Sequence, residues 1–305
     1  MRVVNDKQET TETKVLDPLS LVTHSILTAF GVLSVVFSPL PMIVAAVRLP
    51  EPWSKVAAIL GAILALLFFN VEPAVVVMTF VFGLFVADGV SRDVKFWPML
   101  GQAGSVATLV SFVALLICAQ WDGVTPLQFW LLLCDGFMTQ LQSAIKLQDP
   151  LQWDFLRSTL VHEGPFLLLS SVFLSFWLSL GLAAHLGLMK PGSPYSSEGL
   201  RQIRLPMWSS GIFLALFILV NILSEKGFHW LLGLYRVSAS LMFIAGSVCI
   251  SQVLARKGTS PRLRTVIYSS LMVLGFPIVV GVGVLGPWFL RKSAVRLNER
   301  LEEVI

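Results

Sequence analysis

Four side chains that can form ion pairs or strong hydrogen bonds stand within or beside long apolar stretches of this chain: His24, Asn70, Glu72 and Arg236. An ionisable side chain at the centre of a bilayer costs about 3 kcal/mol or more, so such residues usually face a binding site or a water-filled cavity. Their depth in the apolar stretches predicts a cavity, lined by these four residues, that takes up a small molecule.

Three of the four residues also have a purely structural explanation. His24 lies about a turn and a half into the first apolar block, where a histidine can be hydrogen-bonded near a membrane interface. Asn70 and Glu72 precede Pro73 directly, and an Asn cap, an acidic residue and an early proline all favour the start of a helix. Helix capping therefore accounts for Asn70 and Glu72 without any ligand.

Arg236 follows Trp230 by about two turns of helix. The apolar block 230–255 is longer than a bilayer requires, so the guanidinium can reach the interface along its own aliphatic stem. The alternative is a buried cation, which would receive an anionic ligand or pair with Glu72.

No motif of a catalytic or metal-binding site is present in the sequence. We find no HExxH, GxSxG or phosphate-binding loop, no histidines four residues apart and no pair of carboxylates within one apolar block. The three cysteines lack the spacing of a metal site or of a disulfide framework. We therefore expect no enzymatic activity, no cofactor and no metal, and any energised transport would have to use a separate ATPase or an ion gradient.

The composition predicts that these residues are positioned by membrane-spanning helices. Of the 305 residues, 55% are hydrophobic and 13% charged, whereas a soluble domain carries about 25% charged residues. The apolar residues come in blocks, and about 20 helical residues span the hydrocarbon of a bilayer. We expect an all-α polytopic membrane bundle whose main partner is the lipid bilayer. The net charge of +4 is spread over the loops and does not predict nucleic-acid binding.

The blocks divide the chain into a polar N-terminal tail (1–18), a single transmembrane domain (19–290) and a short basic amphipathic tail (291–305). Tryptophans at several block ends fit the headgroup layer. Eight spans follow from apolar length: 19–37, 55–69, 71–87, 100–119, 165–188, 207–223, 230–255 and 265–290.

A ninth crossing depends on residues 39–47, which begin within the turn SPLP and contain both of its prolines. If they cross, Lys and Arg divide 14 to 7 between the two sides, with the N-terminus on the basic, cytoplasmic side. We therefore favour a helical hairpin over residues 19–47. The same count places the basic C-terminal tail on the opposite side, so eight or nine crossings both stay open.

Segment 120–164 is predicted to lie outside the membrane. Within it, residues 127–146 have the pattern of an amphipathic helix, either a lid over a cavity or a simple connector. One face carries Trp130, Cys134, Phe137, Leu141 and Ile145, and the other Gln128, Asp135 and Gln142. The motif HEGP around His162 predicts a turn.

Ala57, Gly61 and Ala65 form a ridge of small residues at helical spacing. Such ridges let helices approach closely. The ridge predicts either packing within the bundle or a docking face for a partner subunit.

Three stretches of the chain resemble the YybS-like family of bacterial multi-pass membrane proteins: the turn SPLPM, the link NVEPA and the closing GLYRVSASLMFIAGSVCISQVLARKG … LGPWFLRKS. The resemblance covers most of the chain and implies a bacterial cytoplasmic (inner) membrane. It also implies a distant similarity to the S components of energy-coupling-factor vitamin transporters. Those proteins bind a small molecule within a helical bundle and dock on a coupling subunit through an alanine-xxx-alanine signature. Here the first helix offers only Ser25 and Ala29.

Two functions are compatible with these features. The first is a small-solute binding or transport component, with a membrane coupling subunit as its partner. The second is a structural or scaffold protein whose basic loops, amphipathic segment and C-terminal tail recruit envelope proteins.

Overall fold

The computed structural model describes residues 18–33, 37–68, 73–145, 150–204, 207–223, 228–260 and 275–286, together with 263, 266, 267, 270 and 271. Within these residues all regular secondary structure is helical, which confirms the predicted all-α class. In chain order the helices are α1 (Pro18–Leu33), α2 (Pro39–Arg48), α3 (Trp53–Phe68), α4 (Pro73–Ser91), α5 (Phe96–Trp121), α6 (Pro126–Ala144), α7 (Pro150–His185), α8 (Ser197–Arg201), α9 (Met207–Leu223) and α10 (His229–Arg256). A further helix covers Phe276–Gly286.

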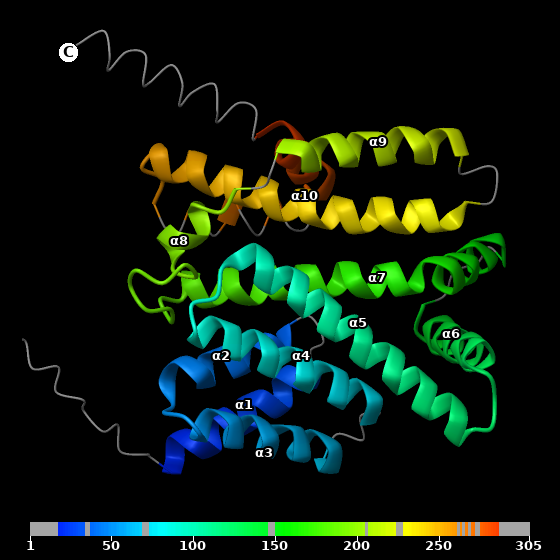
Figure 1. Cartoon of the computed structure of the whole chain (residues 1–305), viewed down its shortest axis with the longest axis horizontal. Helices are drawn as coiled ribbons and strands as arrows, with labels where there is room; N and C mark the ends of the chain where they lie inside the picture. Colours follow the sequence, from blue (N-terminus) through cyan, green and yellow to red (C-terminus); the bar gives the residue numbers. More distant parts are fainter. Residues whose placement is uncertain are drawn as a thin grey trace, which may run out of the picture.

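The helices form two groups that meet at α7 (Figure 1). In the first group α1 packs mainly on α3, and α2 packs mainly on α4. In the second group α10 packs on both α7 and α9. Helices α2 and α5 also contact α7 and so join the two groups.

Among the residues that the structure describes, three helices are long and apolar enough to cross a membrane: Phe96–Trp121, Leu151–His185 and Trp230–Arg256. Residues 19–47 do contain two helices, α1 and α2, which contact each other. Helix α2 has only 10 residues, which is about 15 Å and half of the hydrocarbon thickness. The count of eight or nine crossings therefore stays a prediction.

The motif HEGP does not form the predicted turn, because it lies inside the 36-residue helix α7. Pro165 has no N–H to donate to the carbonyl of Val161, four residues earlier. The indole Nε1–H of Trp130 on α6 donates to that carbonyl instead, at 3.0 Å. Gly164 makes room for the same ring, since a Cβ there would lie 2.5 Å from Trp130 Cζ2. Trp130 thus stabilises a continuous helix where the sequence pattern predicts a break.

Helix α6 confirms the helix predicted within residues 127–146. It begins with a capping box between Thr125 and Gln128. Cys134 and Met138 are buried against the protein, as four-residue spacing requires, whereas Phe137 is 53% exposed. The protein therefore covers only part of the predicted apolar face, and Phe137 lies on the part that α7 leaves exposed.

The ridge of Ala57, Gly61 and Ala65 on α3 faces α1. Ala57 and Ala65 are fully buried, and a Cβ on Gly61 would lie 2.5 Å from the Cβ of Thr28. Ser25 and Ala29 of α1 are buried as well. Both sets of small residues are therefore covered within the chain.

The helix Phe276–Gly286 crosses α10 at a contact between two glycines. A methyl group on Gly246 would overlap the carbonyl of Val279, and one on Gly283 would overlap the carbonyl of Met242. Only glycine allows two helix backbones to approach this closely. This crossing fixes the last described helix beside α10.

One end of the molecule gathers most of the basic residues that the structure describes. The start of α3, the α4–α5 connection, α8 and the C-terminal end of α10 all lie at the left in Figure 1, opposite α6. Hydrogen bonds tie these segments together: Ser193 Oγ donates to Asp93 at 2.6 Å, and Trp97 Nε1 donates to the carbonyl of Arg204 at 2.8 Å. Of the 11 Lys and Arg in the described residues, nine belong to this basic end: Arg48, Lys55, Arg92, Lys95, Lys190, Arg201, Arg204, Arg256 and Lys257.

Candidate functional site

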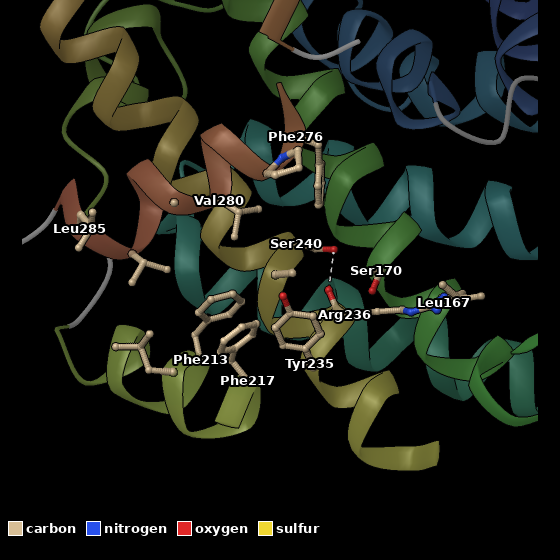
Figure 2. A pocket seen from close by; sticks show the side chains of 15 residues that line it. Leu167, Ser170, Phe213, Phe217, Tyr235, Arg236, Ser240, Phe276, Val280 and Leu285 are labelled. Carbon is tan, nitrogen blue, oxygen red and sulfur yellow. Dashed lines mark hydrogen bonds between the residues drawn. The ribbon is translucent and has the colours of Figure 1, made fainter. Parts of the chain in front are cut away.

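A cavity of about 680 Å³ opens between α7, α9, α10 and the helix Phe276–Gly286 (Figure 2). This volume lies within the range of small-molecule sites, about 300–1,000 Å³. Leu214, Phe217 and Leu285 line it and are each about half exposed, so the cavity is open to the outside of the bundle. A ligand can therefore enter it sideways, between α9 and the last described helix.

Most of the cavity wall is apolar and aromatic. The ring of Tyr235 on α10 lies 5.3 Å from that of Phe213 and 6.0 Å from that of Phe217, both on α9. Phe276 stacks on Phe243 of α10 with ring centroids 4.9 Å apart. These contacts pre-form an apolar surface, which favours a ligand with a hydrocarbon portion.

Arg236 supplies the cationic group of the cavity. Its guanidinium Nε lies 2.8 Å from Oε2 of Glu163 on α7. The N–H is poorly aligned with that oxygen, so the contact is an ion pair rather than a well-formed hydrogen bond. The Glu163 side chain is 3% exposed and that of Arg236 33%, so the carboxylate is buried while the guanidinium still reaches the cavity.

Two serines add hydroxyl groups to the same cavity. Ser240 Oγ donates to the carbonyl of Arg236 at 3.1 Å, so its proton is already used within α10. Ser170 on α7 is 7% exposed, and its Oγ has no hydrogen-bond partner among the described residues. A buried hydroxyl without a partner is costly, and it marks a place where a ligand or water would bind.

Of the four residues predicted to line one cavity, only Arg236 is found in this one. His24 lies on α1 in the other group of helices and does not line it. Asn70 and Glu72 fall outside the described residues, so neither a cap nor a pairing of Glu72 with Arg236 is described.

His24 has a local explanation. It is 6% exposed, and its Nδ1 lies 2.6 Å from the carbonyl oxygen of Ser20, one turn earlier in α1. This is the backbone bond expected of a histidine near a helix end. Its Nε2 has no partner within the described part of the chain.

Sequence analysis missed Glu163, the ion-pair partner of Arg236. The adjacent Gly164 and Pro165 predict a turn, and a carboxylate in a turn is normally solvated. The available signal is that Glu163 stands two residues before the long apolar run that begins at Pro165. Acidic residues at such a boundary can pair with a cation on a neighbouring helix.

The groups that line the cavity can bind a ligand through charge, hydrogen bonds and apolar contact. Ser170 has no histidine or other base beside it in the cavity wall, and no group of three His, Cys, Asp or Glu among the described residues could hold a metal ion. The cavity combines the cation of Arg236, the hydroxyls of Ser170, Ser240 and Tyr235, and a large apolar surface.

No family model, no curated protein and no solved structure matches this chain.

Proposed function

We propose that this chain is an integral membrane protein that holds a small amphipathic solute in the cavity between α7, α9, α10 and the helix Phe276–Gly286. The observation that carries this proposal is the cavity itself, in which the guanidinium of Arg236 meets an apolar wall. This combination selects molecules that have both a hydrocarbon portion and a polar group.

Membrane insertion is supported by the surface of α5. Only 22% of its most apolar 18-residue window is buried in the protein. Leu109, Phe112 and Ile117 are each more than half exposed. In water this continuous apolar face would cause aggregation, whereas in a bilayer it contacts lipid tails.

The proposed membrane is the bacterial cytoplasmic membrane, with the basic end facing the cytoplasm. The positive-inside rule relates Lys and Arg in short loops to the cytoplasmic side. The basic end carries nine of these residues, whereas only Arg157 and Arg236 lie elsewhere among the described residues. The N-terminus would then be cytoplasmic, since α1 and α2 form a hairpin that returns to this end.

Cysteine labelling tests this orientation. In a chain without its three native cysteines, we expect Lys190→Cys to react only with reagents that reach the cytoplasm. Asp122→Cys, in the exposed α5–α6 connection, would react from the outside of intact cells. Labelling of both positions from the same side would reject the orientation.

Native mass spectrometry of the detergent-purified protein tests solute binding. We expect a bound molecule of low mass that is reduced in occupancy by a bulky substitution such as Ala239→Trp, because Ala239 lines the cavity. A matched substitution in the lipid-facing surface, Val113→Trp, controls for added bulk. Absence of any bound molecule, or its equal retention in both variants, would reject this cavity as the site.

Transport by way of a coupling subunit stays a proposal with less support. The small residues of α1 and α3 that could form a docking face are buried against each other. A coupling subunit would have to separate these helices or dock elsewhere.

A scaffold role would instead use α6, which exposes Leu127, Leu132 and Phe137. Copurification of a stable protein partner that depends on these α6 residues, without any small molecule, would favour the scaffold.

A further inference from the structure

We propose that the cavity recognises anionic amphiphiles, and that Ser170 and Arg236 together bind the anionic headgroup while the aromatic wall takes the hydrocarbon chain. This inference rests on the proposed function and names the class of solute. It also assigns a binding role to Ser170, which no sequence motif indicates.

The first argument is the unused hydroxyl of Ser170. Its side chain is more than nine-tenths buried, it lines the cavity, and its Oγ has no hydrogen-bond partner among the described residues. Figure 2 shows this hydroxyl on the same side of the cavity as the guanidinium of Arg236. A ligand oxygen on that side would satisfy the hydroxyl and remove the cost of its burial.

The second argument concerns charge. Glu163 contacts the guanidinium at its Nε. A guanidinium has five N–H donors and can bind two anions that lie in different directions. The pair is also asymmetric, since Arg236 is one-third exposed and Glu163 is almost fully buried. Glu163 therefore holds the guanidinium in place from α7, and the remaining donors are available to a ligand.

The third argument is the position of these groups along the helices. Arg236 is six residues after Trp230, which corresponds to about 9 Å along α10. If Trp230 marks the headgroup layer, the guanidinium lies just below it, with the apolar wall reaching deeper. An amphiphile in the outer half of the bilayer would present its headgroup at this depth. The side opening between α9 and the helix Phe276–Gly286 would admit its chain.

Free fatty acids and anionic phospholipids share this chemistry. The experiment uses radiolabelled dodecanoate at pH 8 and the full chain in phosphatidylcholine nanodiscs, with empty nanodiscs subtracted. Unlabelled dodecanoate, dodecanol and dodecylammonium compete for the site. A second set of nanodiscs contains phosphatidylglycerol, which lowers the apparent affinity for dodecanoate if a phospholipid headgroup is the natural occupant. If the apparent affinity for dodecanoate is unchanged in the nanodiscs that contain phosphatidylglycerol, the natural occupant is a free amphiphile.

We expect dodecanoate to compete at least about tenfold better than dodecanol, the ratio that corresponds to one charge-assisted hydrogen bond. Ser170→Ala should weaken dodecanoate binding about tenfold. Ser179→Ala is the matched control, since Ser179 is another buried hydroxyl of α7 without a partner, but it lies outside the cavity. It should bind dodecanoate as the wild type does.

Glu163→Gln separates headgroup recognition from a merely structural role of the ion pair. It removes the competing negative charge, while the glutamine amide oxygen can still accept from the guanidinium and hold it in place. Affinity for dodecanoate should therefore rise severalfold, and affinity for dodecanol should stay the same. The double variant Glu163→Gln/Arg236→Gln, which leaves no buried charge behind, should bind the two probes equally.

Two results would overturn the inference. If dodecanol competes as well as dodecanoate in the wild type, the cavity binds the hydrocarbon chain without recognising the charge of the headgroup. The proposal that anionic amphiphiles are recognised would then be wrong, while the broader proposal of solute binding would stand. If Ser170→Ala and Ser179→Ala behave alike, Ser170 is not part of the site. Failure of all three amphiphiles to compete would reject the proposed solute class, whereas the cavity itself is rejected only by the mass-spectrometry result given above.

Discussion

Substituting Arg236 and substituting Glu163, the two partners of the buried ion pair, should lower the free energy of unfolding by different amounts. Arg236→Gln leaves a carboxylate that is 3% exposed without its counter-charge. Removing one partner of a buried pair costs about 3–5 kcal/mol, because the remaining charge stays in a medium of low polarity. Glu163→Gln instead leaves a guanidinium that is 33% exposed, and the glutamine amide oxygen can still accept a hydrogen bond from it. We therefore expect Arg236→Gln to cost about 3 kcal/mol and Glu163→Gln about 1 kcal/mol.

The double variant Glu163→Gln/Arg236→Gln should be more stable than Arg236→Gln alone, since two neutral amides can share a hydrogen bond. The measurement is the apparent free energy of unfolding, from titration of mixed micelles with sodium dodecyl sulfate and detection by circular dichroism. A double-mutant cycle then gives the coupling between the two side chains. Equal losses for the two single variants, or a double variant that loses their sum, would refute the reasoning, because the pair would then not be a buried, coupled charge pair.

Three further predictions concern the parts of the fold that hold the cavity in place. Trp130→Phe should cost about 2 kcal/mol, because the carbonyl freed by the proline of α7 loses its donor; a loss no larger than that of Phe129→Leu on the same helix would contradict this. Gly283→Ala should destabilise by about 1–3 kcal/mol or more, since the added methyl group overlaps α10, whereas Gly281→Ala, with open space around it, should be neutral or slightly stabilising; similar melting temperatures for the two variants would disprove the close crossing. Burial, and secondly the charge of Asp93, raise the pKa of Tyr195, so its neutral form is favoured in the folded state. Its contribution to stability is present below about pH 10, the ordinary pKa of tyrosine, and is lost as the pH rises above that value. Thermal melts from pH 8 to 11 should show this decline in the wild type and a flatter profile in Tyr195→Phe; parallel profiles would count against it.

Much of the fold could be predicted from local sequence signals. Prolines at the first turn mark the beginnings of α2 and α6, and the Thr125–Gln128 capping box fixes the start of α6. The helical hairpin of α1 and α2 follows from the prolines that separate their apolar residues. The ridge of Ala57, Gly61 and Ala65 indicates close helix packing, and the structure covers it with α1. These features depend on residues close together in the chain, so they can be read without the tertiary structure.

The continuous helix α7 could not be predicted in this way. Gly164 and Pro165 form a strong turn signal, and what overrides it is a tryptophan more than 30 residues earlier in the chain. Tertiary contacts can outweigh local propensity in this manner, and here the contact supplies the one missing hydrogen bond. The predicted turn also explains why Glu163 was missed, because a carboxylate in a turn would be exposed to water.

Only part of the candidate site could be predicted, because the rest depends on tertiary contacts. Arg236 is visible from the sequence, because a cation in an apolar block is unusual. Its partner and the free hydroxyl of Ser170 depend on which faces of α7 and α10 meet. Serines are frequent in this chain, and several of those described donate to a carbonyl of their own helix, as Ser240 and Ser247 do. Only the packed structure distinguishes the hydroxyl of Ser170, which faces the cavity without a partner.

The most direct measurement for the central claim is photo-crosslinking with a twelve-carbon carboxylate that carries a diazirine at its far end. The protein is irradiated in nanodiscs, and the modified peptides are mapped by mass spectrometry. We predict adducts on residues 207–223 and 275–286, which form two walls of the cavity, and their loss when excess dodecanoate is present. Adducts concentrated on the exposed face of α5, with yields that dodecanoate does not reduce, would show that the probe only follows lipid exposure and would contradict the account.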